Sequence, residues 1–215
     1  MTIRYPSAAA LLLAAAALTA CAPDAEPPAA PGSSAPGSSA PGGATTAPTV
    51  PPPPAAASIP TDCRGLVDAA TYTATFGETP LNDPLSIEPG RAGAVTPTAA
   101  PVGATYREII DSATELRCLW RAPDAALRYL QVDVGTVPPN VGRARLDQLA
   151  ADGYRCEDAL DGRRCQRVSE VEGSEASTID RAVTQFLRDD VYIQVEQLDF
   201  PTDGLLPSIV DELWG

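Results

Sequence analysis

The sequence contains no histidine and no lysine among its 215 residues. Histidine is the usual general base near neutral pH and the commonest side-chain ligand of metals, so its absence excludes Ser-His and Cys-His nucleophile systems and imidazole-based metal sites. No Gly-x-Ser-x-Gly, Ser-x-x-Lys, P-loop or Gly-x-Gly-x-x-Gly motif occurs either. We therefore expect no cofactor, no metal and no enzymatic activity of these common classes.

Positive charge is also scarce. The chain has 15 arginines against 28 acidic residues, and its formal net charge is −13. Such a protein repels phosphate backbones, so a nucleic-acid partner is not expected. Anionic lipid headgroups would attract it little, and any attachment to a membrane must come from another device.

Long apolar runs are limited to residues 8–18, close to the N-terminus. This run has the length of a signal-peptide core, and it is shorter than the roughly 20 residues that span a bilayer. The next stretch, Leu18-Thr19-Ala20-Cys21, resembles the bacterial lipobox. The resemblance implies that Cys21 becomes the mature N-terminus and carries acyl chains such as palmitate. The alternative, an ordinary secretory signal with an incidental cysteine, fits badly because Leu18 would stand where a small residue is preferred.

The composition changes after the lipobox. Residues 22–60 contain 12 prolines and few large apolar side chains, which predicts a disordered tether. We expect a lipoprotein signal peptide over 1–20, a lipid anchor and tether over 21–60, and a single extracytoplasmic domain over 61–215. Because two acyl chains anchor a protein stably, the predicted location is the outer face of the cell membrane, with the lipid on Cys21 as the link.

Apolar periodicity within 61–215 predicts alternating helices and hairpins. We expect helices at 69–76, 102–113, 141–152 (with Asn140 as its N-cap) and 207–214, and strands at 116–121, 130–134, 154–156, 163–168, 181–188 and 191–198. Residues 78–103 and the acidic stretch 170–180 are predicted as loops, and the acidic stretch lacks the spacing of a Ca²⁺ site. This order predicts an α+β fold, an antiparallel sheet with helices packed on one face.

Five cysteines are present, and Cys21 accounts for the odd one. The other four allow three pairings. We expect Cys156–Cys165, because these residues lie on opposite arms of a predicted hairpin, and Cys63–Cys118, which would join the first helix to the first core strand. Their spacing matches no Cys-x-x-Cys metal or redox site, and export favours oxidation.

Two motifs carry a family resemblance. Cys63-x-x-Leu-Val precedes a short helix that ends at Phe76, and Cys118-Leu-Trp120 follows with two more cysteines downstream. This set resembles actinobacterial secreted lipoproteins of unknown function, and it is distantly similar to extracytoplasmic sensor domains of actinobacterial Ser/Thr kinases. The resemblance implies a small α+β domain with two disulfides outside the membrane, and it brings no activity with it.

A few side chains are candidates for binding. Trp120 could stack on a sugar, although its position in a strand is also typical of a core residue. The cluster of Arg155, Arg163, Arg164 and Arg167 could meet an anionic polymer or partner, or it could be the exposed face of the disulfide hairpin.

The function predicted from these observations is a membrane-anchored envelope lipoprotein whose domain binds a ligand or an envelope protein without catalysis. Two alternatives stay open. One is an enzyme that acts on cell-wall polysaccharide through a pair of carboxylates, and the other is a structural or scaffold lipoprotein.

Overall fold

The structure is a computed structural model that describes residues 56–82, 93–121, 127–172 and 178–215. All of these residues belong to one compact unit, Pro51–Gly215. The predicted signal peptide, Cys21 and most of the tether lie outside the described residues, as do residues 173–177 of the acidic stretch and the middle of the loop predicted over 78–103.

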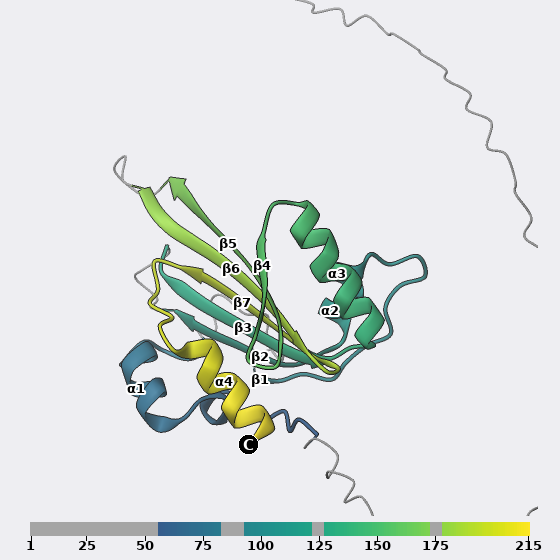
Figure 1. Ribbon diagram of the computed structural model, residues 1–215. Helices are drawn as coiled ribbons and strands as arrows, with labels where there is room; N and C mark the ends of the chain where they lie inside the picture. Colours follow the sequence, from purple (N-terminus) through teal and green to yellow (C-terminus); the bar gives the residue numbers. More distant parts are fainter. Residues whose placement is uncertain (1–55, 83–92, 122–126, 173–177) are drawn as a thin grey trace, which may run out of the picture. The chain divides into compact units, whose positions relative to one another are not determined.

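Seven strands form one antiparallel sheet in the order β1-β2-β3-β7-β6-β5-β4 (Figure 1). The strands are β1 (Gly93–Ala94), β2 (Thr114–Arg121), β3 (Tyr129–Thr136), β4 (Arg155–Ala159), β5 (Gly162–Glu172), β6 (Thr178–Arg188) and β7 (Val191–Leu198). Hairpins join β2 to β3, β4 to β5, β5 to β6 and β6 to β7, and the central pair β3–β7 brings together strands that are far apart in sequence. The predicted α+β class with an antiparallel sheet is confirmed.

In the described ranges, four α-helices and one short 3₁₀ helix accompany the sheet. They are η1 (Cys63–Leu66), α1 (Ala69–Phe76), α2 (Tyr106–Ser112), α3 (Pro139–Ala151) and α4 (Leu205–Trp214). Asp68 caps α1, because its carboxylate accepts hydrogen bonds from the backbone N–H groups of Ala70 and Thr71. Each helix range predicted from the sequence overlaps one of these helices.

One face of the sheet carries the larger core. The side chains of Cys118 and Trp120 in β2, Val132 in β3 and Ile193 in β7 are buried there against η1, α1 and α4. Trp120 is fully buried and stacks on Phe76 of α1, with 3.9 Å between the ring centroids. The packing of η1, α1 and α4 on this face agrees with the predicted sheet that carries helices on one face.

The opposite face has helices too, which corrects the expectation that all helices pack on one side. Leu187 and Tyr192 are neighbours in sequence of Phe186 and Ile193, and they point the other way, into a second core with Leu146 and Leu149 of α3. Figure 1 shows α2 and α3 on the side of the sheet away from α1 and α4. The runs Phe186-Leu187 and Val191–Ile193 are buried on both faces because each face has its own helices.

Two local expectations are wrong. Helix α3 begins at Pro139, which lies at the first helical position, so Asn140 is inside the helix rather than its cap. The acidic stretch 170–180 is not a loop where it is described, because β5 continues to Glu172 and β6 starts at Thr178. Val171 and Ile179 are directly opposed there, and such β-branched pairs stabilise a hairpin despite the flanking charges.

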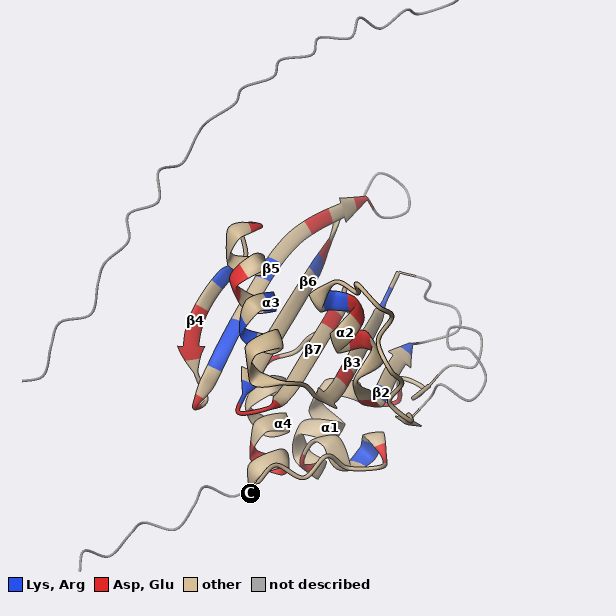
Figure 2. Cartoon of the chain, turned by 90° about the vertical axis from the view of Figure 1, so that its right-hand side faces the viewer, with Lys and Arg blue, Asp and Glu red and all other residues tan. Residues whose placement is uncertain are grey.

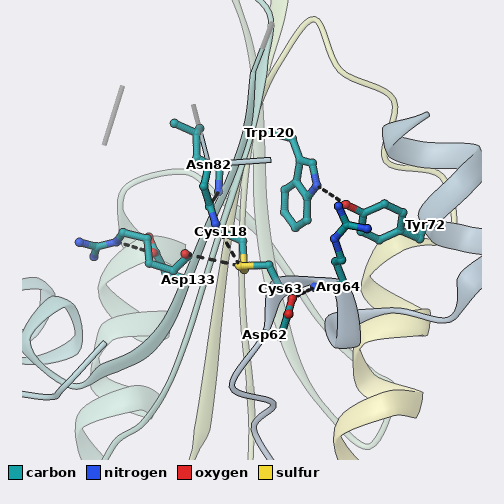
Figure 3. Close-up of a disulfide and its surroundings, with 10 residues drawn as sticks. Asp62, Cys63, Arg64, Tyr72, Asn82, Cys118, Trp120 and Asp133 are labelled. Carbon is teal, nitrogen blue, oxygen red and sulfur yellow. Dashed lines mark hydrogen bonds and ion pairs between the residues drawn. A yellow bond between two sulfur atoms is a disulfide. The ribbon is translucent and has the colours of Figure 1, made fainter. Parts of the chain in front are cut away.

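Both predicted disulfides are confirmed, Cys63–Cys118 and Cys156–Cys165. The first joins η1 to the middle of β2 on the face that carries the larger core (Figure 3). The second links opposed residues of the β4–β5 hairpin, whose two-residue turn places Leu160 and Asp161 at positive φ, 54° and 56°. Both positive φ values are those of the type I′ turn that two-residue hairpins favour.

The packed part of the described chain starts before the predicted domain boundary at residue 61. Ala57 and Ile59 pack against the larger core, and the backbone N–H of Ser58 donates a 2.8 Å hydrogen bond to the carbonyl of Leu213 in α4. The last residues of the predicted tether, 57–59, therefore belong to the folded domain and are fixed to the C-terminal helix, which corrects the predicted boundary.

Candidate functional site

The face of the sheet that carries α2 and α3 is hollowed into a cleft of about 660 Å³. We call it the polar cleft, because arginine, carboxylate and amide side chains line most of it. Figure 2 looks onto this side of the molecule, with α2 and α3 in front of the sheet. The lining residues are Thr98, Pro101, Arg107, Glu108, Asp111, Ser112, Arg117, Gln131, Asp133, Arg145, Tyr154, Arg167, Arg181, Val183, Gln185, Gln194, Val195 and Glu196.

The floor of the polar cleft follows from the register of the sheet. Arg117 is opposite Asp133, Asp133 is opposite Gln194, and Gln194 is opposite Gln185, so four strands contribute one row of polar side chains. Directly opposed residues of antiparallel strands point to the same face, with side chains about 5 Å apart. The row is therefore built by the sheet itself and not by loops.

A buried carboxylate lies in this row. Asp133 is 8% exposed, and its two oxygens accept hydrogen bonds from Arg117 Nε at 2.7 Å and from Gln131 Nε2 at 2.6 Å. Burial raises the pKa of Asp133, while Arg117 and Gln131 act in the opposite direction. Figure 3 shows Asp133 on the opposite side of the sheet from Trp120 and Tyr72.

A second ion pair lies two residues further along β7. Glu196 Oε1 accepts from Arg181 Nη2 at 2.6 Å and from the hydroxyl of Tyr129 at 2.6 Å. Burial, followed by the hydrogen bond to Glu196, raises the pKa of Tyr129 to about 12, so its hydroxyl stays protonated and donates at neutral pH. Hydrogen bonding to Glu196 raises the pKa of Arg181.

Helix α2 contributes the acidic wall. Asp111 accepts a hydrogen bond from Gln194 Nε2 at 3.3 Å and lies 3.6 Å from Arg107 Nε. Glu108 and Thr105 form a capping box at the start of α2, and the hydrogen bonds from Thr105 lower the pKa of Glu108. The helix position therefore depends on a Thr-x-x-Glu signal in the sequence.

Helix α3 and strand β5 contribute a different wall. Arg145 projects from α3 and donates to Gln148 Oε1 at 2.9 Å, and the Arg167 guanidinium lies over the Tyr154 ring, 4.5 Å from its centroid. Among the described residues, neither arginine forms an ion pair with a carboxylate. Gln185, the member of the floor row on β6 and so on the strand next to β5, is 4% exposed.

Gln185 accepts from the hydroxyl of Tyr192 through its Oε1 atom. Burial raises the pKa of Tyr192, so this hydroxyl remains a donor. Within the described part of the chain, the Gln185 amide nitrogen has no hydrogen-bond partner, although the residue lines the cleft. It is a donor available to a molecule bound in the cleft.

The structure separates the residues that the sequence singles out. Trp120 is fully buried in the larger core, and its Nε1 donates to the Tyr72 hydroxyl at 3.4 Å, so it offers no surface for stacking. The expected arginine cluster is divided between the two faces of β5, because alternate residues of a strand point in opposite directions. It is therefore not one basic patch.

Of the four arginines in that cluster, only Arg167 lines the polar cleft. Arg163 pairs with Asp147 of α3 at 2.6 Å, and Arg164 pairs with Glu157 of β4. Arg155 is exposed opposite Gln166. Two of the three arginines outside the cleft thus form ion pairs with carboxylates of the domain.

The sequence analysis did not identify most residues of the polar cleft as candidates. Gln131, Asp133, Gln194 and Glu196 occupy the polar positions of alternating strands, a pattern typical of an ordinary solvent-facing sheet surface. One signal in the sequence could have pointed to the cleft. The predicted hairpin of β2 and β3 places the opposite charges of Arg117 and Asp133 close together. The contribution of α2 and α3 depends on long-range packing that periodicity does not encode.

Within the described residues, no group of three or more Cys, Asp or Glu side chains is placed to hold a metal ion. No helix of the described ranges is long and apolar enough to cross a membrane. The side chains of the polar cleft offer hydrogen bonds and charge pairing from fixed positions.

Comparison with known proteins found no family model and no curated protein that matches the chain. The polar cleft is consequently interpreted from its own geometry. It can hold a small polar molecule against a preformed row of donors and acceptors, since about 660 Å³ is within the usual range of ligand pockets.

Proposed function

We propose that the chain is a membrane-anchored lipoprotein of the cell envelope and that its extracytoplasmic domain binds a small polar ligand in the polar cleft without catalysis. The polar cleft is the observation that carries this proposal. The anchor follows from the lipobox at Cys21, and the tether of 22–60 gives the domain reach from the membrane.

A small ligand fits the observations better than a protein partner. Large apolar side chains that are exposed in the described residues number four, Val102, Tyr106, Leu127 and Val168, and among them Val102 and Tyr106 alone are close in sequence. Single exposed apolar residues are normal on a protein surface and do not form a docking patch. The polar cleft, in contrast, is concave and has polar groups already in position.

A binding role also fits the state of the cleft carboxylates. A general acid or nucleophile needs a carboxylate that can reach the substrate, whereas Asp133, Glu196, Asp111 and Glu108 each accept hydrogen bonds from neighbouring groups of the domain. These bonds fix the carboxylates as structural elements of the floor and wall. The raised pKa of Asp133 is the one observation that favours the alternative of a wall-polysaccharide hydrolase.

The anchor is tested by fractionation. The full chain should partition into the detergent phase of a cell extract, and Cys21→Ala should move it to the soluble fraction. A Cys21→Ala protein that stays in the detergent phase would show that the lipid does not hold it.

Binding in the cleft is tested with two matched substitutions. Val183 lies on the cleft floor opposite Glu196, and Val168 is 60% exposed on the other face of the sheet. Val183→Trp should fill the cleft and Val168→Trp should leave it open. The probes are glucose, N-acetylglucosamine, glucuronate, glucose 6-phosphate, glutamate and alanyl-alanine.

At least one probe should raise the melting temperature of the wild-type protein and of Val168→Trp, and none should raise that of Val183→Trp. A shift that survives Val183→Trp, or no shift with any probe, contradicts binding in the cleft. Release of reducing ends from wall polysaccharide that disappears in Asp133→Asn would favour the enzyme instead.

A further inference from the structure

We infer that the polar cleft recognises an oxyanion, a carboxylate or phosphate group of its ligand, through Arg145, Arg167 and Gln185. This inference rests on the proposed function and adds the chemical class of the ligand. We call the part of the cleft between α3, β5 and β6 the oxyanion end.

The first argument is the distribution of charge. The domain from residue 61 onward has 14 arginines and 26 acidic residues, so its net charge is −12. The polar cleft, however, is lined by five arginines and four carboxylates. More than a third of the arginines of this acidic domain thus line one concavity, and such a local excess of positive charge attracts an anion to that site.

The second argument is how these charges pair. Arg117 pairs with Asp133, Arg181 with Glu196 and, more loosely, Arg107 with Asp111. The fourth carboxylate, of Glu108, caps α2. Arg145 and Arg167 are the two arginines of the cleft that pair with no carboxylate among the described residues, and both belong to the oxyanion end.

The third argument is that every available group at this end is a donor. The stacking on Tyr154 holds the Arg167 guanidinium in place while leaving its N–H groups for a ligand. Arg167 lies opposite Val183 in the sheet, and Gln185 is two residues further along the same strand, which places the two side chains diagonally on one face. Arg145 completes the set from α3.

A planar guanidinium matches the two oxygens of a carboxylate or phosphate, and the amide nitrogen of Gln185 can donate to a third acceptor. The acidic wall of α2 excludes a second anionic group, since Asp111 and Glu108 line the cleft there. Carboxylate and amide oxygens on that side instead accept hydrogen bonds from hydroxyl groups. The class that fits is a hydroxylated small molecule with one oxyanionic group.

The test compares three related probes by isothermal titration calorimetry on the full chain in detergent. Glucose is neutral, glucuronate carries a carboxylate and glucose 6-phosphate carries a phosphate. Binding of at least one of the two anions should be ten or more times tighter than binding of glucose, and added salt should weaken it. Which of the two binds more tightly separates a carboxylate ligand from a phosphate ligand.

Substitutions then locate the effect. Arg145→Gln and Arg167→Gln should each weaken binding of the anionic probe about tenfold, the usual effect of losing one charge-assisted hydrogen bond. Arg143→Gln is the matched control, because Arg143 lies on the same helix, is exposed and does not line the polar cleft. It should change the dissociation constant less than twofold.

The possible failures are distinct. If glucose binds as tightly as the anions, or if Arg145→Gln and Arg167→Gln change nothing while Val183→Trp abolishes binding, the oxyanion inference is wrong and the proposed function stands. If no probe binds to the wild-type protein, both are wrong. If Arg143→Gln weakens binding as much as the other two, the anion is held by general surface charge and the oxyanion end is overturned.

Discussion

Removal of Arg117 should destabilise the domain by leaving Asp133 buried without its cation. The side chains of Arg117 and Asp133 are 18% and 10% exposed, so water compensates little for the loss. Breaking a fully buried ion pair costs about 3–5 kcal/mol, and with this residual exposure and the remaining hydrogen bond from Gln131 we expect about 2–3 kcal/mol for Arg117→Ala at neutral pH.

The effect should depend on pH, and its sign follows from the pKa of Asp133. Burial raises this pKa in the folded protein, so the folded state takes up a proton more readily than the unfolded chain. The stabilisation that the folded protein gains from protonated Asp133 is complete below the pKa of the unfolded chain, about 3.9. It is lost as the pH rises through the pKa of Asp133 in the folded protein. Arg117→Ala removes an influence that lowers the pKa, so its deficit should be full at pH 7 and should shrink towards pH 4.

The measurement is urea unfolding followed by tryptophan fluorescence for the wild type, Arg117→Ala, Asp133→Asn and the double variant. Asp133→Asn should recover more than 1 kcal/mol in the Arg117→Ala background, because the neutral amide no longer requires a cation. Arg107→Ala is the control, since the side chains of Arg107 and Asp111 are 73% and 44% exposed, and it should cost less than about 0.5 kcal/mol. A double variant no more stable than Arg117→Ala, or a deficit independent of pH, would refute the reasoning.

Further predictions concern the two disulfides and the Asp68 cap of helix α1. The two disulfides close loops with sequence separations of 55 and 9, so Cys63→Ala/Cys118→Ala should cost about 4 kcal/mol and Cys156→Ala/Cys165→Ala about 2.6 kcal/mol in urea unfolding. The reverse order would show that chain entropy does not govern their effect. Hydrogen bonds from the Thr71 hydroxyl and backbone, and from Ser208, lower the pKa of Asp68 to about 2, so its contribution is present above about pH 4 and is lost as the pH falls towards 2. The melting temperature of Asp68→Asn should therefore lie below that of the wild type at pH 6 and approach it at pH 2, and a constant gap would exclude this role.

Local patterns predicted much of the fold. The alternation of Val191, Ile193 and Val195 identified β7, and the placement of the cysteines identified both disulfides. The pairing of β3 with β7 could not be predicted in this way, because their residues are separated by more than 50 positions and no local signal links them. The second helical layer was missed for the same reason.

The candidate site was harder to predict than the fold. Trp120 and the arginine cluster attracted attention by residue type, yet Trp120 is buried and only Arg167 of that cluster faces the cleft. Asp133 and Gln185 looked like ordinary polar positions of half-exposed strands. Their significance depends on burial by α2 and α3, and burial is a property of the tertiary structure.

The Cys63–Cys118 disulfide also determines how the domain would bear force. Under the proposed anchorage, a pull from the membrane enters through Ser58 and reaches Cys63 within five residues. The covalent bond then passes the tension directly to Cys118 in β2, next to Arg117 of the polar cleft, so the chain between the two cysteines, with α1 and α2, carries none of it. Tension from the membrane would thus take a short path through one disulfide into the sheet, and the segment between the two cysteines would stay folded under that load.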